Sequence, residues 1–293
     1  MPRSLAQPLY RGMTADQLLL QYSPRRTLPD AAAIFQSWAD RSADFRNRAR
    51  ARLDIAYGAN PAARLDLFLP KARKPPLHVY FQGGYWQFFG KSDLSFIAEG
   101  LTQAGIAVAV VGYPLCPTVP LAGAIRHVRL ALAFLWREAE HLGLKAGKLQ
   151  ISGHSAGAHL CTMLLATLWP RFRPDLPADI IGSAILISGV YELEPLRHIE
   201  TGEALRLTAA MARRHSPITL RPASKARLLF CTGGQESAEF KRQTSALARL
   251  WANEGSRLEV ISFSTRNHLT ILDELAPHQS ALVRRALDML EEH

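Results

Sequence analysis

The sequence predicts an α/β fold in which helices cover both faces of a mostly parallel, twisted sheet. Short apolar segments typical of strands alternate with longer segments of helical periodicity. A turn-rich stretch, residues 58–61, separates the first two strand-like segments and indicates an antiparallel hairpin. Residues 106–111 are wholly apolar, as expected of a parallel strand that is buried on both faces. A hairpin followed by repeated β-α units therefore defines the fold class.

Residues 1–52 precede these units, and we expect them to form an N-terminal arm that packs on or caps the core. Residues 53–293 then form a single α/β domain, a size that one core can support. The expected strands are residues 53–57, 65–69, 78–81, 106–111, 149–152, 184–188, 226–231 and 258–263. The expected helices are residues 31–52, 92–104, 121–142, 156–168, 237–253 and 269–292.

No strand pattern is evident between residues 191 and 220. A helical segment at residues 204–213 lies within this stretch. We therefore expect a small, cap-like helical insertion at about residues 191–220.

Composition excludes several classes of function. Of the 293 residues, 48% are hydrophobic and 20% are charged, which is typical of a folded globular protein. The formal net charge of +10 is not accompanied by a nucleic-acid-binding module, so we interpret it as a solvated basic face with no nucleic-acid partner. No apolar stretch is long enough to cross a bilayer, and none follows Met1 as in a secretory signal, so we expect a cytoplasmic protein without a membrane partner. Three widely spaced cysteines favour small buried side chains over disulfides: Cys116, Cys161 and Cys231.

Ser155 is the candidate nucleophile. It lies in the sequence Gly-His-Ser-Ala-Gly, residues 153–157, between a short strand and an apolar helix. This is the context of the nucleophile elbow in the α/β-hydrolase fold, where flanking glycines relieve crowding at a strained turn. The alternative is a glycine-rich turn in which the serine only caps the helix.

A second glycine-rich loop follows the third expected strand. Residues 82–86 read Gln-Gly-Gly-Tyr-Trp, and glycines there allow backbone N–H groups to face a substrate. The N–H of Ala156, directly after the nucleophile, is the other expected donor of an oxyanion hole. A plain turn after a strand is the alternative.

A serine nucleophile needs a base and an acid, which follow it in the chain in this fold. His268 lies in a polar loop directly after the last expected strand, whereas His278 lies within the expected last helix and His293 is the terminal residue. We therefore choose His268 as the base. The loop after strand 226–231 offers Glu236, with Glu239 about one helical turn further on, and we prefer Glu236 as the acid because it is nearer to the strand.

Two further histidines, His154 and His159, flank the nucleophile. Their spacing with His268 supports no set of metal ligands, so we expect no metal and interpret both as packing or supporting residues.

Four segments resemble the arylformamidase (kynurenine formamidase) branch of the α/β hydrolases, within the wider group of hormone-sensitive-lipase-like esterases. Residues 82–86 are similar to the His-Gly-Gly-Tyr-Trp loop of that branch, and residues 153–160 resemble its elbow. Residues 188–196, Ser-Gly-Val-Tyr-Glu-Leu-Glu-Pro-Leu, differ from its usual block mainly by Glu in place of Asp. Residues 236–240, Glu-Ser-Ala-Glu-Phe, resemble its Asp-Ser-Pro-Glu-Phe.

The resemblance implies a cofactor-free hydrolase of aryl formamides or of aryl and short-chain esters. It implies that Ser155, Glu236 and His268 are catalytic and that the N–H groups of Gly83, Gly84 and Ala156 form the oxyanion hole. The chain departs from the family pattern at Gln82, which replaces a histidine, and at Glu236, which replaces an aspartate.

The substrate is the least determined feature. An aryl-formamide or aryl-amide substrate is our first hypothesis, because Tyr85 and Trp86, with Phe88 and Phe89, are able to line an aromatic pocket beside Gln82. The same aromatic residues would also suit a hydrophobic core. A carboxylesterase for short acyl or aryl esters is the second hypothesis, and a catalytically silent binding protein with the hydrolase fold is the third. The sequence leaves a homodimer open.

Overall fold

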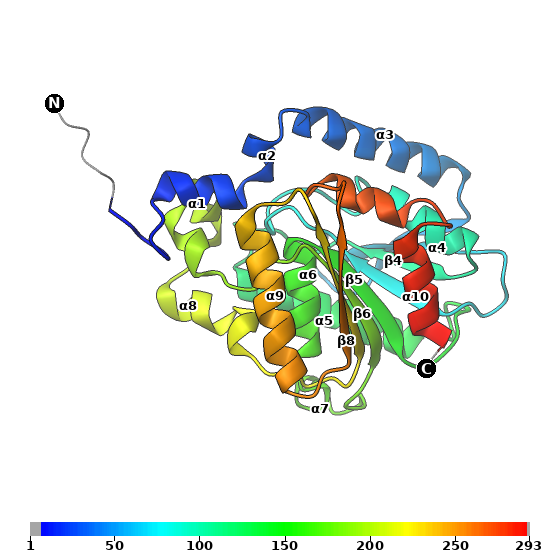
Figure 1. The fold of residues 1–293 in the computed structure, drawn as a ribbon. Helices are drawn as coiled ribbons and strands as arrows, with labels where there is room; N and C mark the ends of the chain where they lie inside the picture. Colours follow the sequence, from blue (N-terminus) through cyan, green and yellow to red (C-terminus); the bar gives the residue numbers. More distant parts are fainter. Residues whose placement is uncertain (1–6, 292–293) are drawn as a thin grey trace.

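The structure is a computed structural model that describes residues 7–291; the expectations that involve Met1 and His293 therefore lie outside the described residues. An eight-stranded sheet forms the centre of the molecule, in the order β1-β2-β4-β3-β5-β6-β7-β8 (Figure 1). Its strands are β1 (Ala51–Ala56), β2 (Arg64–Phe68), β3 (Leu77–Phe81), β4 (Ala107–Val111), β5 (Leu149–His154), β6 (Ile181–Ile187), β7 (Arg227–Gly233) and β8 (Leu258–Phe263).

Strand direction confirms the predicted fold class. β1 pairs with β2, and β2 with β4, in antiparallel register, whereas the six strands from β3 to β8 run parallel to one another. β3 lies between β4 and β5, so the loops after β3 and β5 are neighbours at one edge of the sheet. In open sheets of this kind a ligand binds at the carboxyl ends of the strands, near such a change of strand order.

Each face of the sheet carries its own hydrophobic core. Along the strands, successive side chains alternate between the two cores, as the two-residue period of a strand requires. One core includes α5 (Leu121–Glu138), α6 (Ala156–Leu165) and α9 (Ala238–Asn253). The other includes η1 (Ser95–Ala98), α4 (Glu99–Gln103) and α10 (Ala281–Glu291).

The prediction of one helix over residues 269–292 is wrong. The structure has a 3-10 helix, η5 (Thr270–Leu275), followed by a break and then by α10. Pro277 lies in the break, because proline lacks an N–H group and disfavours a helical conformation in the residue before it. His278 consequently lies in a turn and not inside a helix.

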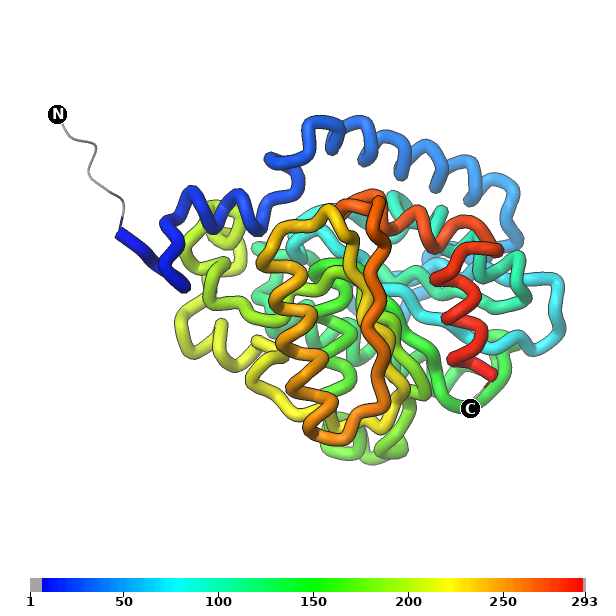
Figure 2. Tube along the Cα trace, in the orientation of Figure 1, coloured from blue at the N-terminus to red at the C-terminus, as the bar shows by residue number. Residues whose placement is uncertain are grey.

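The N-terminal arm is more helical than the sequence pattern showed. It consists of α1 (Ala15–Tyr22), α2 (Pro24–Thr27) and α3 (Ala31–Arg48), which cross the end of the sheet above the site (Figures 1 and 2). Thr14 and Gln17 form a capping box that begins α1. Trp38 and Phe45 bury one side of α3 against the second core, and Arg46 forms an ion pair with the fully buried Asp66. The arm is therefore packed onto the α/β domain over its whole helical length.

The segment between residues 191 and 220 contains short helices and, among the described residues, no strand. They are η2 (Glu194–His198), η3 (Glu200–Leu205), α8 (Ala209–Arg214) and η4 (Pro217–Thr219). A further short helix, α7 (Trp169–Phe172), follows α6. Within residues 7–291, no helix has the length and apolar character that a bilayer crossing would need.

Burial of His78 predicts how stability depends on pH. This side chain is fully buried on β3, where Nδ1 contacts Gln150 Oε1 at 2.7 Å and Nε2 contacts Ser152 Oγ at 2.6 Å. Burial lowers its pKa to about 4, so the folded protein holds the imidazole neutral. In the unfolded chain, the His78 imidazole binds a proton below its ordinary pKa of about 6.5. His78 therefore lowers the free energy of unfolding as pH falls from about 6.5 to about 4.

We expect His78→Gln to reduce the pH dependence of the unfolding free energy by about 1.4 kcal/mol per pH unit between about pH 6.5 and pH 4. Glutamine retains hydrogen-bonding capacity but does not titrate. Denaturant unfolding at several pH values checks this, and identical slopes for wild type and variant would contradict it.

Candidate active site

Ser155 lies at the sharp turn between β5 and α6. Its backbone has φ 55° and ψ −116°, a conformation that costs a residue with a side chain about 1–3 kcal/mol. The N–H of Ser155 donates to the carbonyl of Ile187 on β6 at 2.9 Å, which helps to hold the turn. The serine caps no N–H group of α6 through its side chain. The geometry is therefore that of a nucleophile elbow and not of a helix cap.

Two glycines allow this turn to form. A methyl group on Gly157 would lie 1.9 Å from the carbonyl oxygen of Phe81, and one on Gly153 would lie 2.3 Å from the carbonyl carbon of Gly157. Both distances are far below van der Waals contact. No other residue fits without displacing α6 from the end of β3.

The structure brings Glu236 and His268 together. Nδ1 of His268 lies 3.0 Å from Oε2 of Glu236. The other carboxylate oxygen accepts hydrogen bonds from Ser188 Oγ and from the N–H of Gly233, both at 2.5 Å. The carboxylate of Glu236 is fully buried. Three hydrogen-bonding groups thus face a carboxylate that is shielded from water.

Glu239, the alternative acid, is engaged elsewhere. Its carboxylate forms an ion pair with Arg242 at 2.8 Å and accepts a hydrogen bond from Tyr22 at 2.6 Å. The described contacts therefore place Glu236, and not Glu239, against the imidazole of His268.

Two rings surround His268. The ring of Phe240 lies 4.1 Å from it between centroids, and the ring of His154 lies at 4.6 Å. Nε2 of His154 is 2.7 Å from the carbonyl oxygen of His268, so His154 donates this bond in its neutral form. Burial, with His268 nearby, holds the pKa of His154 well below its usual range. His154 therefore fixes the backbone of His268 without adding a charge.

The loop after β3 passes directly over the elbow. A methyl group on Gly83 would lie 2.7 Å from the carbonyl oxygen of His154 and 3.3 Å from Cβ of Ser155. Gly84 has φ +95° and Tyr85 has φ 53°, so the backbone turns sharply at this point. Among the described residues, the loop and turn hydrogen bonds include none from the N–H groups of Gly83, Gly84 or Ala156. These three backbone N–H groups thus have no hydrogen-bond partner within the part of the chain that the structure describes.

Gln82 and Trp86 do not lie on the cavity wall, although the sequence suggested both as substrate-binding residues. The side-chain nitrogen of Gln82 donates to the carbonyl of Phe89 at 2.6 Å, and the backbone carbonyl of Gln82 accepts from the hydroxyl of Tyr113 at 2.9 Å. Trp86 is fully buried, edge-on to His159 at 4.8 Å. Both residues therefore make contacts that stabilise the loop, and their side chains do not line the cavity. Tyr85 lines the cavity.

A cavity of about 590 Å³ opens above Ser155 and His268. Its aromatic wall includes side chains from the N-terminal arm and from the loop after β3: Phe35, Trp38, Tyr85, Phe88 and Phe89. Its polar residues are Ser23, Arg25, Arg26, Gln87, Glu200 and Thr201. The arm, the loop after β3 and the segment after β6 therefore enclose one site.

The sequence did not reveal several of these contributors. Ser188 and Phe240 lie in segments that carry the family resemblance, but nothing in the residues themselves indicated contacts with Glu236 and His268. Trp38 and Phe35 of α3 were missed because a helical pattern does not show which element its apolar face meets. Nowhere in residues 7–291 do three or more histidine, cysteine or acidic side chains form a cluster able to hold a metal ion. His159 instead contacts the carbonyl of His215 at 2.8 Å.

Comparison with known proteins identifies the family. The chain is 32% identical over 294 aligned residues to a kynurenine formamidase of Danio rerio, covering 96% of this chain and 98% of that protein. The chain belongs to the kynurenine formamidase family. A kynurenine formamidase of Salmo salar is 28% identical over 96% of this chain and 98% of its own length. The BD-FAE family model matches residues 65–169.

Solved structures agree with the fold. A candidate thioesterase from Silicibacter sp. TM1040 superposes with a TM-score of 0.79 and 30% identity, covering 90% of this chain and 96% of that one. An esterase of Pyrobaculum calidifontis superposes with a TM-score of 0.68 at 18% identity, over 89% of this chain and 91% of its own, and shows the fold alone. These likenesses confirm the α/β-hydrolase fold and the predicted serine hydrolase of ester or amide bonds.

Glu236→Gln tests the contact with His268. The amide would offer a donor where Nδ1 now meets a carboxylate oxygen, and this favours the wrong tautomer of the imidazole. We expect kcat to fall by about 10³- to 10⁴-fold with little change in folding. Phenyl acetate hydrolysis and thermal unfolding measure the two effects.

Glu239→Gln is the matched control, because it makes the same chemical change at the acid that faces Tyr22 and Arg242. We expect it to retain kcat for phenyl acetate. The reverse pattern, with kcat lost in Glu239→Gln and kept in Glu236→Gln, would reassign the acid.

Proposed function

We propose that the protein is an arylformamidase that cleaves an aryl formamide through an acyl-enzyme on Ser155. The observation that carries the proposal is the meeting, in one aromatic-walled cavity, of Ser155, His268 and the free N–H groups of Gly83 and Gly84. Acyl transfer needs these parts together: a nucleophile, a base oriented by an acid, and donors for the developing oxyanion.

In the first step, the Ser155 hydroxyl attacks the carbonyl carbon of the substrate while His268 takes its proton. Glu236, in contact with Nδ1, stabilises the resulting imidazolium. The carbonyl oxygen becomes negative and accepts hydrogen bonds from Gly83, Gly84 and Ala156. Removing one such donor typically costs about 3–4 kcal/mol of activation free energy.

Collapse of this intermediate breaks the bond to the leaving group, which receives the proton from His268. The arylamine then leaves, and the formyl group remains on Ser155. A water molecule gives a proton to His268 and attacks the ester, which releases formate and restores the serine. These are the two halves of a covalent hydrolase cycle.

An aromatic leaving group suits the cavity. Phe35 and Trp38 from α3, with Phe89 from the loop after β3, are mutual neighbours with centroids 5.1–5.8 Å apart. Aromatic side chains favour stacked or edge-on contact with a further ring. The family's formamidase members in Danio rerio and Salmo salar support the formamide bond as the reacting group.

A carboxylesterase is the second candidate function. The same residues would cleave an ester, and the resemblance to the Pyrobaculum calidifontis esterase shows that the fold carries such chemistry. The two functions differ in the leaving group, which is an amine in one and an alcohol or phenol in the other.

Ser155→Ala tests the nucleophile. We expect turnover to fall by about 10³-fold or more while folding is retained, because the oxyanion hole and substrate binding alone give only residual catalysis. A fluorophosphonate probe is expected to label wild type at Ser155 and to leave the variant unlabelled. A wild-type protein that neither labels nor hydrolyses any tested substrate would fit the catalytically silent binding protein.

A substrate comparison separates the two functions. We expect turnover of N-formylkynurenine with kcat/KM in the ordinary enzymatic range of about 10⁴–10⁸ M⁻¹ s⁻¹. Parallel assays with p-nitrophenyl acetate supply the reference for ester cleavage. Fast ester cleavage beside negligible formamide cleavage would favour the carboxylesterase.

A further inference from the structure

Residues 23–26 of the N-terminal arm, here called the strap, form one wall of the cavity. All four line it: Ser23, Pro24, Arg25 and Arg26. They connect the last residue of α1, Tyr22, to the start of α3 by way of α2. The position of this wall therefore depends on the contacts that hold the strap in place.

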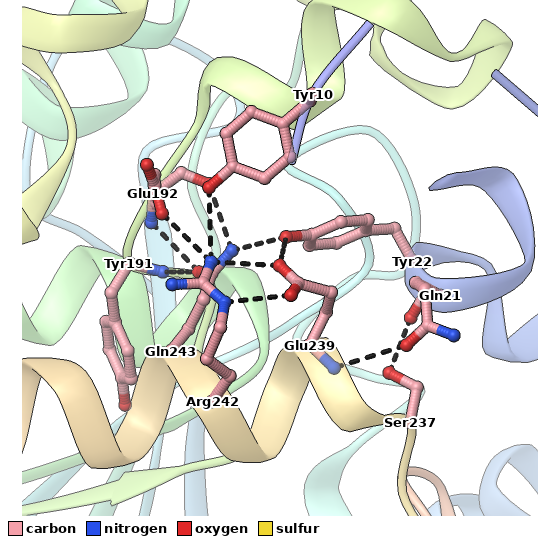
Figure 3. Close-up of polar contacts among 9 residues, drawn as sticks. All are labelled: Tyr10, Gln21, Tyr22, Tyr191, Glu192, Ser237, Glu239, Arg242 and Gln243. Carbon is pink, nitrogen blue, oxygen red and sulfur yellow. Dashed lines mark hydrogen bonds and ion pairs between the residues drawn. The ribbon is translucent and has the colours of Figure 1, made fainter. Parts of the chain in front are cut away.

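Tyr22 anchors one end of the strap. Its side chain is fully buried, and its hydroxyl donates to Glu239 Oε2 at 2.6 Å while accepting from Gln243 Nε2 at 2.6 Å (Figure 3). Gln243 Oε1 in turn accepts from the backbone N–H groups of Tyr191 and Glu192, at 2.6 and 2.9 Å. One phenolic hydroxyl thus joins the arm to α9 and, through Gln243, to the segment after β6.

Charges around this hydroxyl are compensated. Arg242 contacts both oxygens of Glu239, at 2.8 and 2.9 Å, and Glu192 at 2.9 Å (Figure 3). The hydroxyl of Tyr10 accepts from the same guanidinium at 3.2 Å. Burial, with Glu239 adjacent, raises the pKa of Tyr22 far above its usual range, so the phenol remains a donor.

A second pair of bonds fixes α1 beside Tyr22. The hydroxyl of Ser237 donates to the carbonyl of Gln21 at 2.6 Å, and the N–H of Glu239 donates to Gln21 Oε1 at 3.2 Å. These bonds end at the first turn of α9, which directly follows Glu236 in the chain. The first turn of α9 therefore supports both the anchor of the strap and the loop that carries Glu236.

The other end of the strap is held by α3. Ser42 Oγ donates to the carbonyl of Asp93 at 2.8 Å, and Arg41 pairs with Asp273 at 2.6 Å. Between its two ends the strap has lighter contacts: Ser23 Oγ lies 3.2 Å from Thr201 Oγ1, and Arg26 pairs with Glu200 at the surface. The exposed Arg26–Glu200 pair contributes little, and Ser23 makes a single side-chain contact, so we expect the two ends to determine the position of the strap.

We propose that Tyr22 is a positioning residue that holds the strap as a fixed wall of the substrate cavity and thereby sets which leaving groups bind well. This inference rests on the proposed function, because it assigns the cavity above Ser155 to the substrate. Tyr22 itself does not line the cavity. It acts through the four residues that follow it.

Removing only the hydroxyl isolates this role. The ring of Tyr22 lies 6.0 Å from Phe240, whose ring packs on His268 at 4.1 Å. Tyr22→Phe retains that chain of ring contacts and removes the two hydrogen bonds of the anchor. The chemical step should therefore persist while the wall loosens.

The kinetic test compares phenyl acetate with 2-naphthyl acetate, which form the same acetyl-enzyme but differ in the size of the leaving group. We expect Tyr22→Phe to lower kcat/KM for the naphthyl ester by about five- to tenfold through KM, with kcat unchanged and with phenyl acetate within about twofold. Tyr57→Phe is the matched control, because it removes another buried hydroxyl bond, to the carbonyl of Gly112 at 2.6 Å, away from the strap. We expect Tyr57→Phe to leave kcat/KM unchanged for both the naphthyl ester and phenyl acetate.

Limited proteolysis gives a readout that does not depend on turnover. The strap contains two exposed trypsin sites, Arg25 and Arg26. We expect faster cleavage there in Tyr22→Phe than in wild type or Tyr57→Phe. If Tyr22→Phe fails to fold, Glu239→Gln replaces it, since this change weakens the same anchor while preserving side-chain shape.

Two results would overturn the proposal: wild-type selectivity together with wild-type cleavage, or equal losses of kcat for both esters. Failure of the proposed function looks different, whatever the strap does. Wild type would then cleave esters but not N-formylkynurenine, would hydrolyse nothing, or would keep its turnover in Ser155→Ala.

Discussion

Helix α6 approaches the end of β3 so closely that a methyl group on Gly157 would lie 1.9 Å from the carbonyl oxygen of Phe81. β3 leads into the loop with the free N–H groups, and α6 begins directly after Ser155. The contact thus sets, through backbone packing, the distance between Ser155, the proposed nucleophile, and the N–H groups proposed to form the oxyanion hole. A methyl group on Gly83 would likewise lie 2.7 Å from the carbonyl oxygen of His154, so the loop and the elbow pack closely at a second point. Donors held in this way need no reorganisation when charge develops, which is the main source of electrostatic catalysis.

The second constraint is the buried carboxylate of Glu236. A charge without water is costly unless it is fully hydrogen-bonded. Here the side chain folds back toward the strand end, so that one oxygen meets the N–H of Gly233 and the Ser188 hydroxyl and the other faces His268. Glu236 therefore contacts the end of β7 and the imidazole of His268 at the same time.

The sequence predicted the strands and the sharp turn at Ser155 because each depends on local pattern. Buried strands are continuous apolar runs, and the elbow needs glycines at fixed positions. The broken C-terminal helix was missed because an apolar periodicity continues across Pro277. Gln82 was expected to bind substrate, but its side chain does not line the cavity and donates to the carbonyl of Phe89, a contact within the loop that residue types alone do not indicate. The aromatic wall from α3 depends on packing between segments far apart in the chain, which periodicity does not encode.

The residues around Ser155 and the residues of the cavity wall are held by different parts of the structure. Ser155, Glu236 and His268 lie on turns that strands and helices of the sheet hold rigidly, so their geometry is a property of the fold. The walls of the cavity come instead from the N-terminal arm, the loop after β3 and the segment after β6. The arm contributes lining residues from the strap and from α3, and its described contacts reach His268 and the loop of Glu236 through Phe240 and the first turn of α9. Changes in the arm can therefore alter which leaving groups bind without disturbing the residues around Ser155, provided that they leave the Tyr22 ring and the first turn of α9 in place. These two features support both the wall and the loop of Glu236.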